Sequence, residues 1–201
     1  MGKVPALTAW SEAEPYLRNL KETILADIRP LLGMPGHAPF AITREVLSYI
    51  DHLGHLYSGK GSVRDRSQGY LEAILQRIDP NYGRRAGEIY QMYRCGPVHE
   101  FKPKTLENRR GQLLHWLCYV GKRTDTIPIG SCNVSVTHLQ PVSTGSGCKE
   151  YVLPVSTTCL IDDLLASIEE FIQSGPEDER VTAWNRAARE LNAPQPSDFT
   201  V

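Results

Sequence analysis

Apolar side chains recur every three or four residues along much of this chain, which is the spacing of an amphipathic helix. Four such runs occupy the first half of the sequence, separated by short breaks. A capping box at Ser11–Glu14 predicts the start of the first helix, and Arg29-Pro30 predicts its end. Thr43 predicts the start of the second helix, and Asp79-Pro80 the end of the third. The apolar positions are Leu17, Leu20, Ile24 and Ile28; Val46, Leu47, Ile50, Leu53 and Tyr57; Tyr70, Leu71, Ile74, Leu75 and Ile78; and Tyr82, Ala86, Ile89, Tyr90 and Tyr93.

The pattern changes after residue 110. Residues 113–120 are nearly all apolar, and periodicity alone assigns them to neither a buried strand nor a helix. Residues 133–140 alternate between apolar and polar side chains, and a Gly-rich turn at 144–147 separates them from residues 150–155, so the two segments predict an antiparallel hairpin. Helical spacing returns after Thr158 in two runs that are interrupted at Gly175-Pro176. Their apolar positions are Ile161, Leu164, Leu165, Ile168, Phe171 and Ile172, and then Val181, Trp184, Ala188 and Leu191.

These patterns predict an α+β fold that is mostly helical. We expect an up-down bundle of four to six helices with a small antiparallel hairpin or three-stranded sheet near residues 112–155. The length of 201 residues suits one domain, which we place at residues 1–192. Residues 193–201 contain two prolines and few apolar anchors, so they predict a flexible tail.

Composition and cysteine spacing bear on the cellular compartment of the protein. No run approaches the ~18 apolar residues of a membrane span, and the N-terminus lacks the apolar segment of a signal peptide. The five cysteines show no C-x-x-C spacing and are odd in number. They therefore predict reduced thiols in a cytoplasmic protein that does not contact membranes.

The net charge of -1 conceals an uneven distribution. Residues 84–123 carry nine basic and three acidic side chains, whereas residues 160–201 carry three basic and nine acidic ones. One interpretation is that the two segments pair on one surface or simply form solvated faces. The other is that the basic segment binds an anion, because clustered Lys and Arg side chains contact phosphates well.

Three patterns resemble known sites but lack a required part. Residues 54–61 read G-x-x-x-x-G-K-G, but a phosphate-binding P-loop needs a hydroxyl residue after Lys60 and a strand before the loop. His52 and His55 lie three residues apart on a predicted helix without a third ligand. Ser146 lies in a Gly-rich turn with no associated acid or histidine pattern. We therefore expect neither a metal nor a cofactor.

One short motif lies inside the basic segment, at the end of the fourth predicted helix. Residues 93–100 read Tyr-Arg-Cys-Gly-Pro-Val-His-Glu, so that Arg94 and His99 form an R-x4-H pattern. Gly96-Pro97 disturbs the helix, which would let His99 turn back toward Arg94. A guanidinium that holds two phosphate oxygens and an imidazole that titrates near neutral pH are the two functions that metal-free RNA cleavage needs.

This motif resembles that of the HEPN superfamily. Residues 89–104 are also similar to a run in an uncharacterised family of bacterial proteins, in which Tyr-Arg-x-Gly-x-Val-His is followed by an aromatic residue, proline and lysine. The resemblance implies a helical bundle, often dimeric, in which the Arg and His of two protomers meet. It also implies an RNase of a toxin–antitoxin or antiviral system, or an inactive RNA-binding or scaffold form. The chain departs from the pattern at Cys95, where active members commonly carry asparagine, and at Pro97.

Two functions follow as hypotheses. In the first, the chain is a HEPN-like RNA-binding protein and a metal-independent endoribonuclease, with RNA, a second copy and an antitoxin-like protein as its partners. Arg94 and His99 would be catalytic, and the RNA-binding residues would be Arg84, Arg85, Lys102, Lys104, Arg109 and Arg110. In the second, the motif is degenerate and the chain is a non-catalytic interaction module. Arg94 would then bond carbonyls that the kink frees, and His99 would be an internal histidine.

Overall fold

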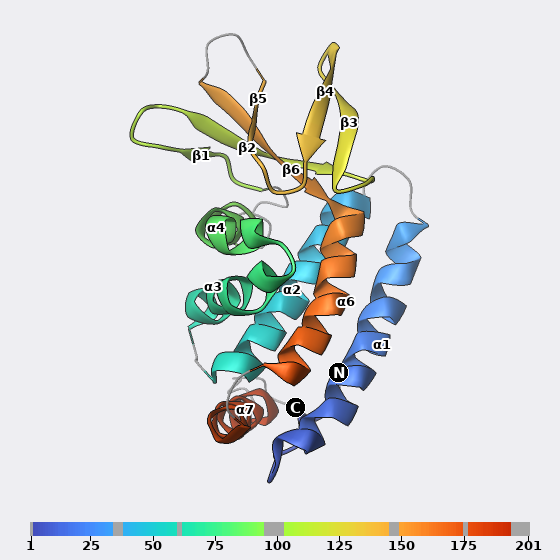
Figure 1. Ribbon diagram of the computed structural model, residues 1–201, viewed down its shortest axis with the longest axis vertical. Coiled ribbons are helices and arrows are strands. Elements are labelled where there is room, and N and C mark those ends of the chain that lie inside the picture. The colour runs from blue at the N-terminus through green and yellow to red at the C-terminus, as the bar shows by residue number, and fades with distance from the viewer. Residues whose placement is uncertain are drawn as a thin grey trace, which may run out of the picture.

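The computed structural model describes residues 2–33, 38–59, 62–94, 103–144, 149–174 and 177–193. Six α-helices lie within these ranges (Figure 1). None of the helices in the described ranges has the length and hydrophobicity needed to cross a bilayer. The helices are α1 (Ala13–Leu32), α2 (Ala38–Ser58), α3 (Val63–Ala73), α4 (Pro80–Ile89), α6 (Thr157–Gln173) and α7 (Glu177–Asn192). The expectation of a mostly helical α+β fold is confirmed.

Helix α2 lies at the centre of the bundle and contacts α1, α3, α6 and α7. The strands gather at one end of the bundle, above α4, whereas α7 lies at the opposite end (Figure 1). Most of the apolar positions predicted for the helices belong to one buried cluster or pack against it, whereas Leu191 is exposed and the side chain of Tyr93 lies outside the description. Leu139, Leu153 and Val155 belong to this cluster, and Leu114 and Trp116 pack against it, so the sheet shares its core with the helices.

Four strands form a mixed sheet in the order β1-β2-β6-β5. Strands β2 and β6 pair in parallel, and the two short edge strands are antiparallel to their neighbours. Their bounds are β1 (Leu106–Glu107), β2 (Leu113–Tyr119), β5 (Val142–Ser143) and β6 (Glu150–Ser156). The apolar run at 113–120, which the pattern left open, is therefore a strand.

The prediction of strands at 133–140 and 150–155 is confirmed in part, but their pairing with each other is wrong: across the predicted turn, β6 pairs antiparallel with the short β5. Strand β4 (Cys132–Thr137) pairs instead with β3 (Thr124–Ile129), a strand that the sequence did not predict. The turn between them contains Gly130, whose φ of 60° suits the left-handed conformation that glycine adopts without strain. Strand β6 pairs in parallel with β2, and the connection between these two strands contains the β3–β4 hairpin.

Several helix boundaries differ from the predictions for local reasons. The capping box at Ser11–Glu14 does not form, because a 3-10 turn, Trp10–Glu12, precedes α1 and makes Glu12 the N-cap, which has no side-chain capping hydrogen bond. Helix α1 continues past Pro30 to Leu32, and α2 begins at Ala38, with Pro39 in its first turn, rather than at Thr43. Pro39 is tolerated in the first turn of α2 because backbone N–H groups at this position have no hydrogen-bond partner within the helix. The predicted tail and the Gly175-Pro176 break lie outside the described residues, apart from Ala193.

Side chains of α7 form hydrogen bonds with the N-terminal segment and hold it against the bundle. The side-chain amide of Asn192 bonds both the N–H and the C=O of Val4, and that of Asn185 bonds both groups of Leu7. The indole N–H of Trp184 donates to the carbonyl of Pro5 at 2.8 Å. These hydrogen bonds satisfy backbone N–H and C=O groups that would otherwise be left without a partner when the segment is buried.

Gly54, the first glycine of the P-loop-like pattern, allows α2 and α3 to approach closely. A Cβ atom at this position would lie 2.2 Å from the carbonyl oxygen of Arg66 on α3. Such a distance is far inside van der Waals contact, and backbone atoms cannot rotate away. The glycine is therefore explained by helix packing rather than by phosphate binding.

We predict that Gly54→Ala lowers the free energy of unfolding by about 1–3 kcal/mol, because the added methyl group forces the two helices apart. Gly69→Ala on α3 is the matched control, since no atom lies within 4 Å of the methyl group it would add. That variant should raise the free energy of unfolding by about 0.5–1 kcal/mol through helix propensity. Urea denaturation measures both, and equal shifts for the two variants would contradict this packing.

Candidate functional site

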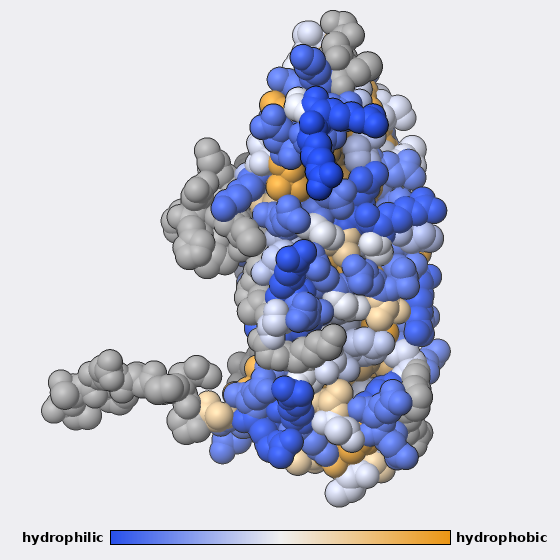
Figure 2. All heavy atoms as spheres, turned by 90° about the vertical axis from the view of Figure 1, so that its left-hand side faces the viewer, coloured by the Kyte–Doolittle hydropathy of each residue, from blue (hydrophilic) through white to orange (hydrophobic). Residues whose placement is uncertain are grey.

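A groove of about 380 Å³ lies between α4 and the four-stranded sheet. On the face of the molecule shown in Figure 2, hydrophilic side chains surround a small hydrophobic area near the sheet end. The groove combines an apolar floor with charged and amide side chains at its edges. It is lined by Arg85, Glu88, Gln91, Leu106, Glu107, Asn108, Gln112, Leu113, Leu114, Pro141 and Tyr151.

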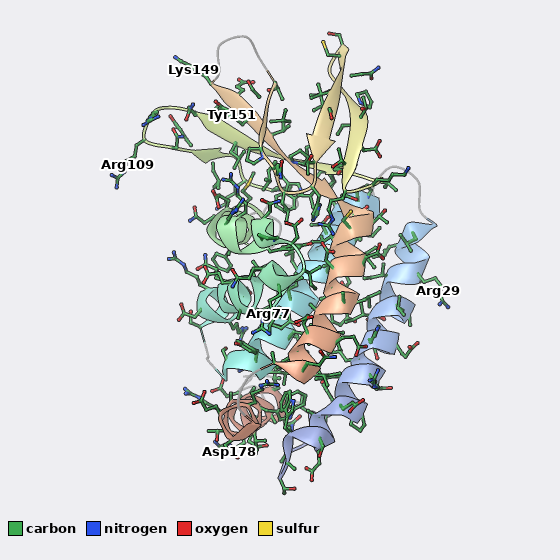
Figure 3. All side chains as sticks on the ribbon, in the orientation of Figure 1. Arg29, Arg77, Arg109, Lys149, Tyr151 and Asp178 are labelled. Atoms are coloured by element: carbon green, nitrogen blue, oxygen red, sulfur yellow. The ribbon has the colours of Figure 1, made fainter. Side chains whose placement is uncertain are left out.

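The turn between β1 and β2 borders the groove, and Asn108 sets its shape. The side-chain oxygen of Asn108 accepts hydrogen bonds from the backbone N–H groups of Arg110, at 2.9 Å, and Gln112, at 3.1 Å. Gly111 has a φ of 69°, which closes the turn without strain. Arg109 and Arg110 are exposed on this turn, and Figure 3 shows Arg109 pointing away from the sheet into solvent.

Hydrogen bonds connect this turn to Tyr151 on β6. The side chain of Asn108 donates to Gln112 at 2.7 Å, and the amide of Gln112 donates to the hydroxyl of Tyr151 at 3.3 Å. Tyr151 pairs with Leu114 across the parallel strands, which places both side chains on the face of the sheet that covers the helices. The aromatic ring at the groove is thus held through the turn that carries Arg109 and Arg110.

The structure describes five of the six predicted RNA-binding residues and brings four of them to the surroundings of the groove. Arg85 lines the groove and pairs with Glu88 at 3.0 Å. Arg109 and Arg110 lie on the bordering turn, and Lys104 is exposed just before β1. The backbone N–H of Lys104 donates to the carbonyl of Met92 at 2.7 Å, which joins the start of β1 to the end of the α4 segment. Arg84 is exposed on α4 but does not line the groove.

The R-x4-H motif cannot be placed as a pair. A π-helical turn, Tyr90–Arg94, follows α4 and contains the backbone of Arg94, whose side chain lies outside the description. His99 and Lys102 also lie outside the described residues. The proximity of Arg94 and His99 therefore stays a prediction.

The acidic C-terminal segment does not cover the predicted basic residues of the groove that the structure describes. Its carboxylates pair instead along the bundle, and Arg123 is the member of the basic segment that meets one of them. These pairs are Glu169 with Arg18 and Lys21, Glu170 with Arg77, Glu190 with His55 and Arg186, and Asp163 with Arg123. Arg84, Lys104, Arg109 and Arg110 form no ion pair with any part of the chain that the structure describes.

Sequence reasoning missed the polar and aromatic part of the groove. Gln91, Asn108, Gln112 and Tyr151 line it, and Lys149 is exposed at the start of β6 (Figure 3). The alternation in residues 150–155 places Tyr151 on the same face as Leu153, which is the one sequence signal for its orientation. The groove itself depends on the pairing of β2 with β6, which the hydrophobic pattern does not encode.

A second polar cluster is buried where α4, α6 and the β3–β4 hairpin meet. The guanidinium of Arg123 contacts Asp79 at 2.5 Å and Asp163 at 2.6 Å. The hydroxyl of Tyr82 donates to the other oxygen of Asp163 at 2.9 Å, and it lies 3.1 Å from Nε2 of His138. Because each of these groups has a partner, the cluster is suited to joining elements rather than to binding a ligand.

The hydrogen bonds fix the tautomer of His138. The backbone N–H of Ser156 donates to its Nδ1 at 3.0 Å, so the proton of the neutral imidazole lies on Nε2 and is donated to Tyr82. Burial, followed by the positive charge of Arg123, lowers the pKa of His138 to about 4. Burial raises the pKa of Asp163, although the hydrogen bond and the charge of Arg123 oppose this shift.

The two histidines considered as metal ligands have protein partners. Nε2 of His52 lies 3.2 Å from the hydroxyl of Tyr16, and His55 lies between Arg66 and Glu190. No group of three or more His, Cys, Asp or Glu side chains that could hold a metal occurs within the described ranges.

Protein-family models, curated proteins and solved structures all fail to match this chain. A function is therefore inferred from the groove itself. It offers exposed cations, amide groups, an aromatic ring and an apolar floor, and these are the groups that bind single-stranded nucleic acids.

We predict that His138→Gln flattens the dependence of stability on pH between 6.5 and 4. In this interval His138 binds a proton in the unfolded chain but not in the folded one, so wild-type stability falls as the pH falls. Removing the group should reduce the slope by up to about 1.4 kcal/mol per pH unit. Urea denaturation at several pH values measures the slope.

Some dependence should remain, because burial and then His55 also lower the pKa of His52 to about 4. Parallel profiles for the wild type and His138→Gln would contradict the tautomer and the environment described for His138.

Proposed function

We propose that the chain binds RNA along the groove between α4 and the sheet. The observation that supports this most is the separation of charge: four exposed basic side chains border the groove without acidic partners in the described chain, while the acidic segment pairs elsewhere. Lys and Arg side chains that are not neutralised internally gain most from phosphate contacts, since binding releases the counterions of the polyanion. These four cations are Lys104, Arg109, Arg110 and Lys149, and the half-buried Arg85, which pairs with Glu88, completes the groove-side set.

The same proposal assigns Arg84 and Lys102 to the RNA backbone, next to the groove-side cations. Arg84 is exposed and follows Gly83 on α4, so a strand that leaves the groove along this helix would pass it. The acidic side chains among the lining residues are Glu88 and Glu107, and Arg85 already pairs with Glu88. The lining residues alone carry more acidic than basic groups, and the basic balance comes from the bordering Lys104, Arg109, Arg110 and Lys149. We therefore expect the phosphates at the edge of the groove rather than inside it.

The catalytic part of the proposal rests on Arg94 and His99. Gln91 lines the groove, and the backbone of Arg94 follows it by three residues within the same π-helical turn. His99 would remove the proton of a ribose 2′-hydroxyl, whose oxygen then attacks the adjacent phosphorus and displaces the 5′-oxygen, which is protonated by water. Arg94 would stabilise the charge that grows on the phosphate. The HEPN resemblance further implies a second copy whose Arg and His complete the cleft.

We predict that Arg109→Gln weakens RNA binding and reduces its salt dependence. One lost phosphate contact should lower the slope of log K against log salt by about 0.7 for a single strand. Arg29→Gln is the matched control, because Arg29 is also exposed but lies on α1, away from the groove (Figure 3). Fluorescence anisotropy with a labelled single-stranded RNA measures both slopes.

A reduced slope in Arg29→Gln but not in Arg109→Gln would place the RNA on another surface. Absence of RNA binding by the wild type at low salt would overturn the proposal and favour the interaction-module hypothesis.

We predict that the purified chain cleaves RNA in the presence of a chelator and that His99→Ala abolishes this activity. A DNA strand of the same sequence should stay intact, because it lacks the 2′-hydroxyl that attacks the phosphorus. Gel analysis of end-labelled strands measures the cleavage. Equal cleavage by the wild type and His99→Ala, or none by either, would exclude the catalytic role while leaving RNA binding to the preceding test.

A further inference from the structure

We propose that the groove holds one unpaired nucleotide of the bound RNA, with its base stacked on Tyr151 and its polar edge bonded by Gln91. The proposal rests on the RNA-binding function argued above and names the form of RNA that the site selects. It predicts a preference for single strands over duplexes, and it assigns the preference to two residues that carry no charge.

The size of the groove favours a single nucleotide. Its volume of about 380 Å³ lies at the lower end of the range of about 300–1,000 Å³ that is typical of pockets for single small molecules. A duplex keeps its bases stacked inside the helix, so it could contact the cations at the rim but could not fill the groove. An unpaired base can leave its strand and enter.

Tyr151 supplies a fixed aromatic surface for that base. Its ring is half-buried on β6, and its hydroxyl is held by Gln112, which is in turn held by Asn108. Leu106 and Leu114 form apolar parts of the same wall. A ring held in this way loses little conformational entropy when a base stacks on it, and stacking is open to every base because each has a π-face.

The stacking surface and the phosphate contacts are set by one turn. Asn108 positions the backbone of Arg110 through its side-chain oxygen and the side chain of Gln112 through its amide. The turn that carries Arg109 and Arg110 therefore also orders the side chain that holds the hydroxyl of Tyr151. In the proposal, phosphates contact this turn while one base occupies the groove beside it.

Gln91 supplies a hydrogen-bonding group for the edge of the base. It lines the groove, is exposed, and its carboxamide has no hydrogen-bond partner within the described ranges. A carboxamide both donates and accepts hydrogen bonds. The edges of nucleic-acid bases do the same, so a glutamine side chain can pair with them. A base that enters the groove would satisfy this group.

The test compares an eight-nucleotide single-stranded RNA with the same sequence annealed to its complement, both labelled with fluorescein and titrated by anisotropy. The wild type should bind the single strand more tightly. Tyr151→Leu removes the ring but keeps an apolar side chain, and it should weaken single-strand binding about 5- to 150-fold, the value of one lost base stack. Tyr151→Phe keeps the ring but removes the hydroxyl that Gln112 holds, so it should weaken binding less than Tyr151→Leu does; equal losses in the two variants would contradict stacking on the ring.

Gln91→Leu gives a second variant at an exposed position, where folding is not at risk. It should weaken single-strand binding about 2- to 12-fold, corresponding to one lost hydrogen bond, and leave duplex binding unchanged. Equal binding of duplex and single strand by the wild type would overturn the inference, as would unchanged affinity in both Tyr151→Leu and Gln91→Leu.

RNA binding and the capture of one unpaired nucleotide are tested separately. Loss of affinity in Arg109→Gln alone, with both groove variants unchanged, would overturn the unpaired nucleotide and retain RNA binding. No binding of either RNA would overturn both.

Discussion

The parallel pairing of β2 with β6 is the constraint on which the rest of the structure depends. It aligns residues 113–119 with 150–156 and sends the chain from Ser156 directly into α6. The pairing sets Leu114 beside Tyr151, so the groove above α4 exists only in this register. A slip of one residue would turn Tyr151 to the opposite face of the sheet. The cluster of Tyr82, His138 and Asp163 secures the same junction by joining α4, the hairpin and α6.

The fold also separates much of the basic segment from the acidic segment of a nearly neutral chain, as the proposed binding of a polyanion requires. The strands lie at one end of the bundle and α7 at the other, so the basic and acidic segments are held apart (Figure 1). Carboxylates of α6 and α7 pair with basic side chains of α1 and α7, with His55 of α2, with Arg77 in the turn after α3, and with Arg123. Lys104, Arg109, Arg110 and Lys149 thus remain exposed to a ligand, which connects the charge pattern along the chain to the proposed function.

The sequence predicted the helices better than the strands, for a physical reason. Helical faces are local, and positions such as Leu17, Ile24 and Phe171 lie in the core as expected. Strand pairing depends on distant segments: β3 contains Pro128, which weakens a strand prediction, and the parallel partner of β2 lies beyond the hairpin. The basic side of the groove could be predicted from composition. Tyr151 and Gln91 could not, because their common surroundings arise only when the sheet has formed.

The most direct measurement of the central claim is the mapping of ultraviolet cross-links between the wild-type chain and a single-stranded RNA by mass spectrometry. The account predicts adducts on peptides that line or border the groove, from residues 84–91, 104–114 and 149–153. Tyr151 should be prominent among them. Adducts confined to α7 or to the β3–β4 hairpin, with the groove peptides unmodified, would contradict it.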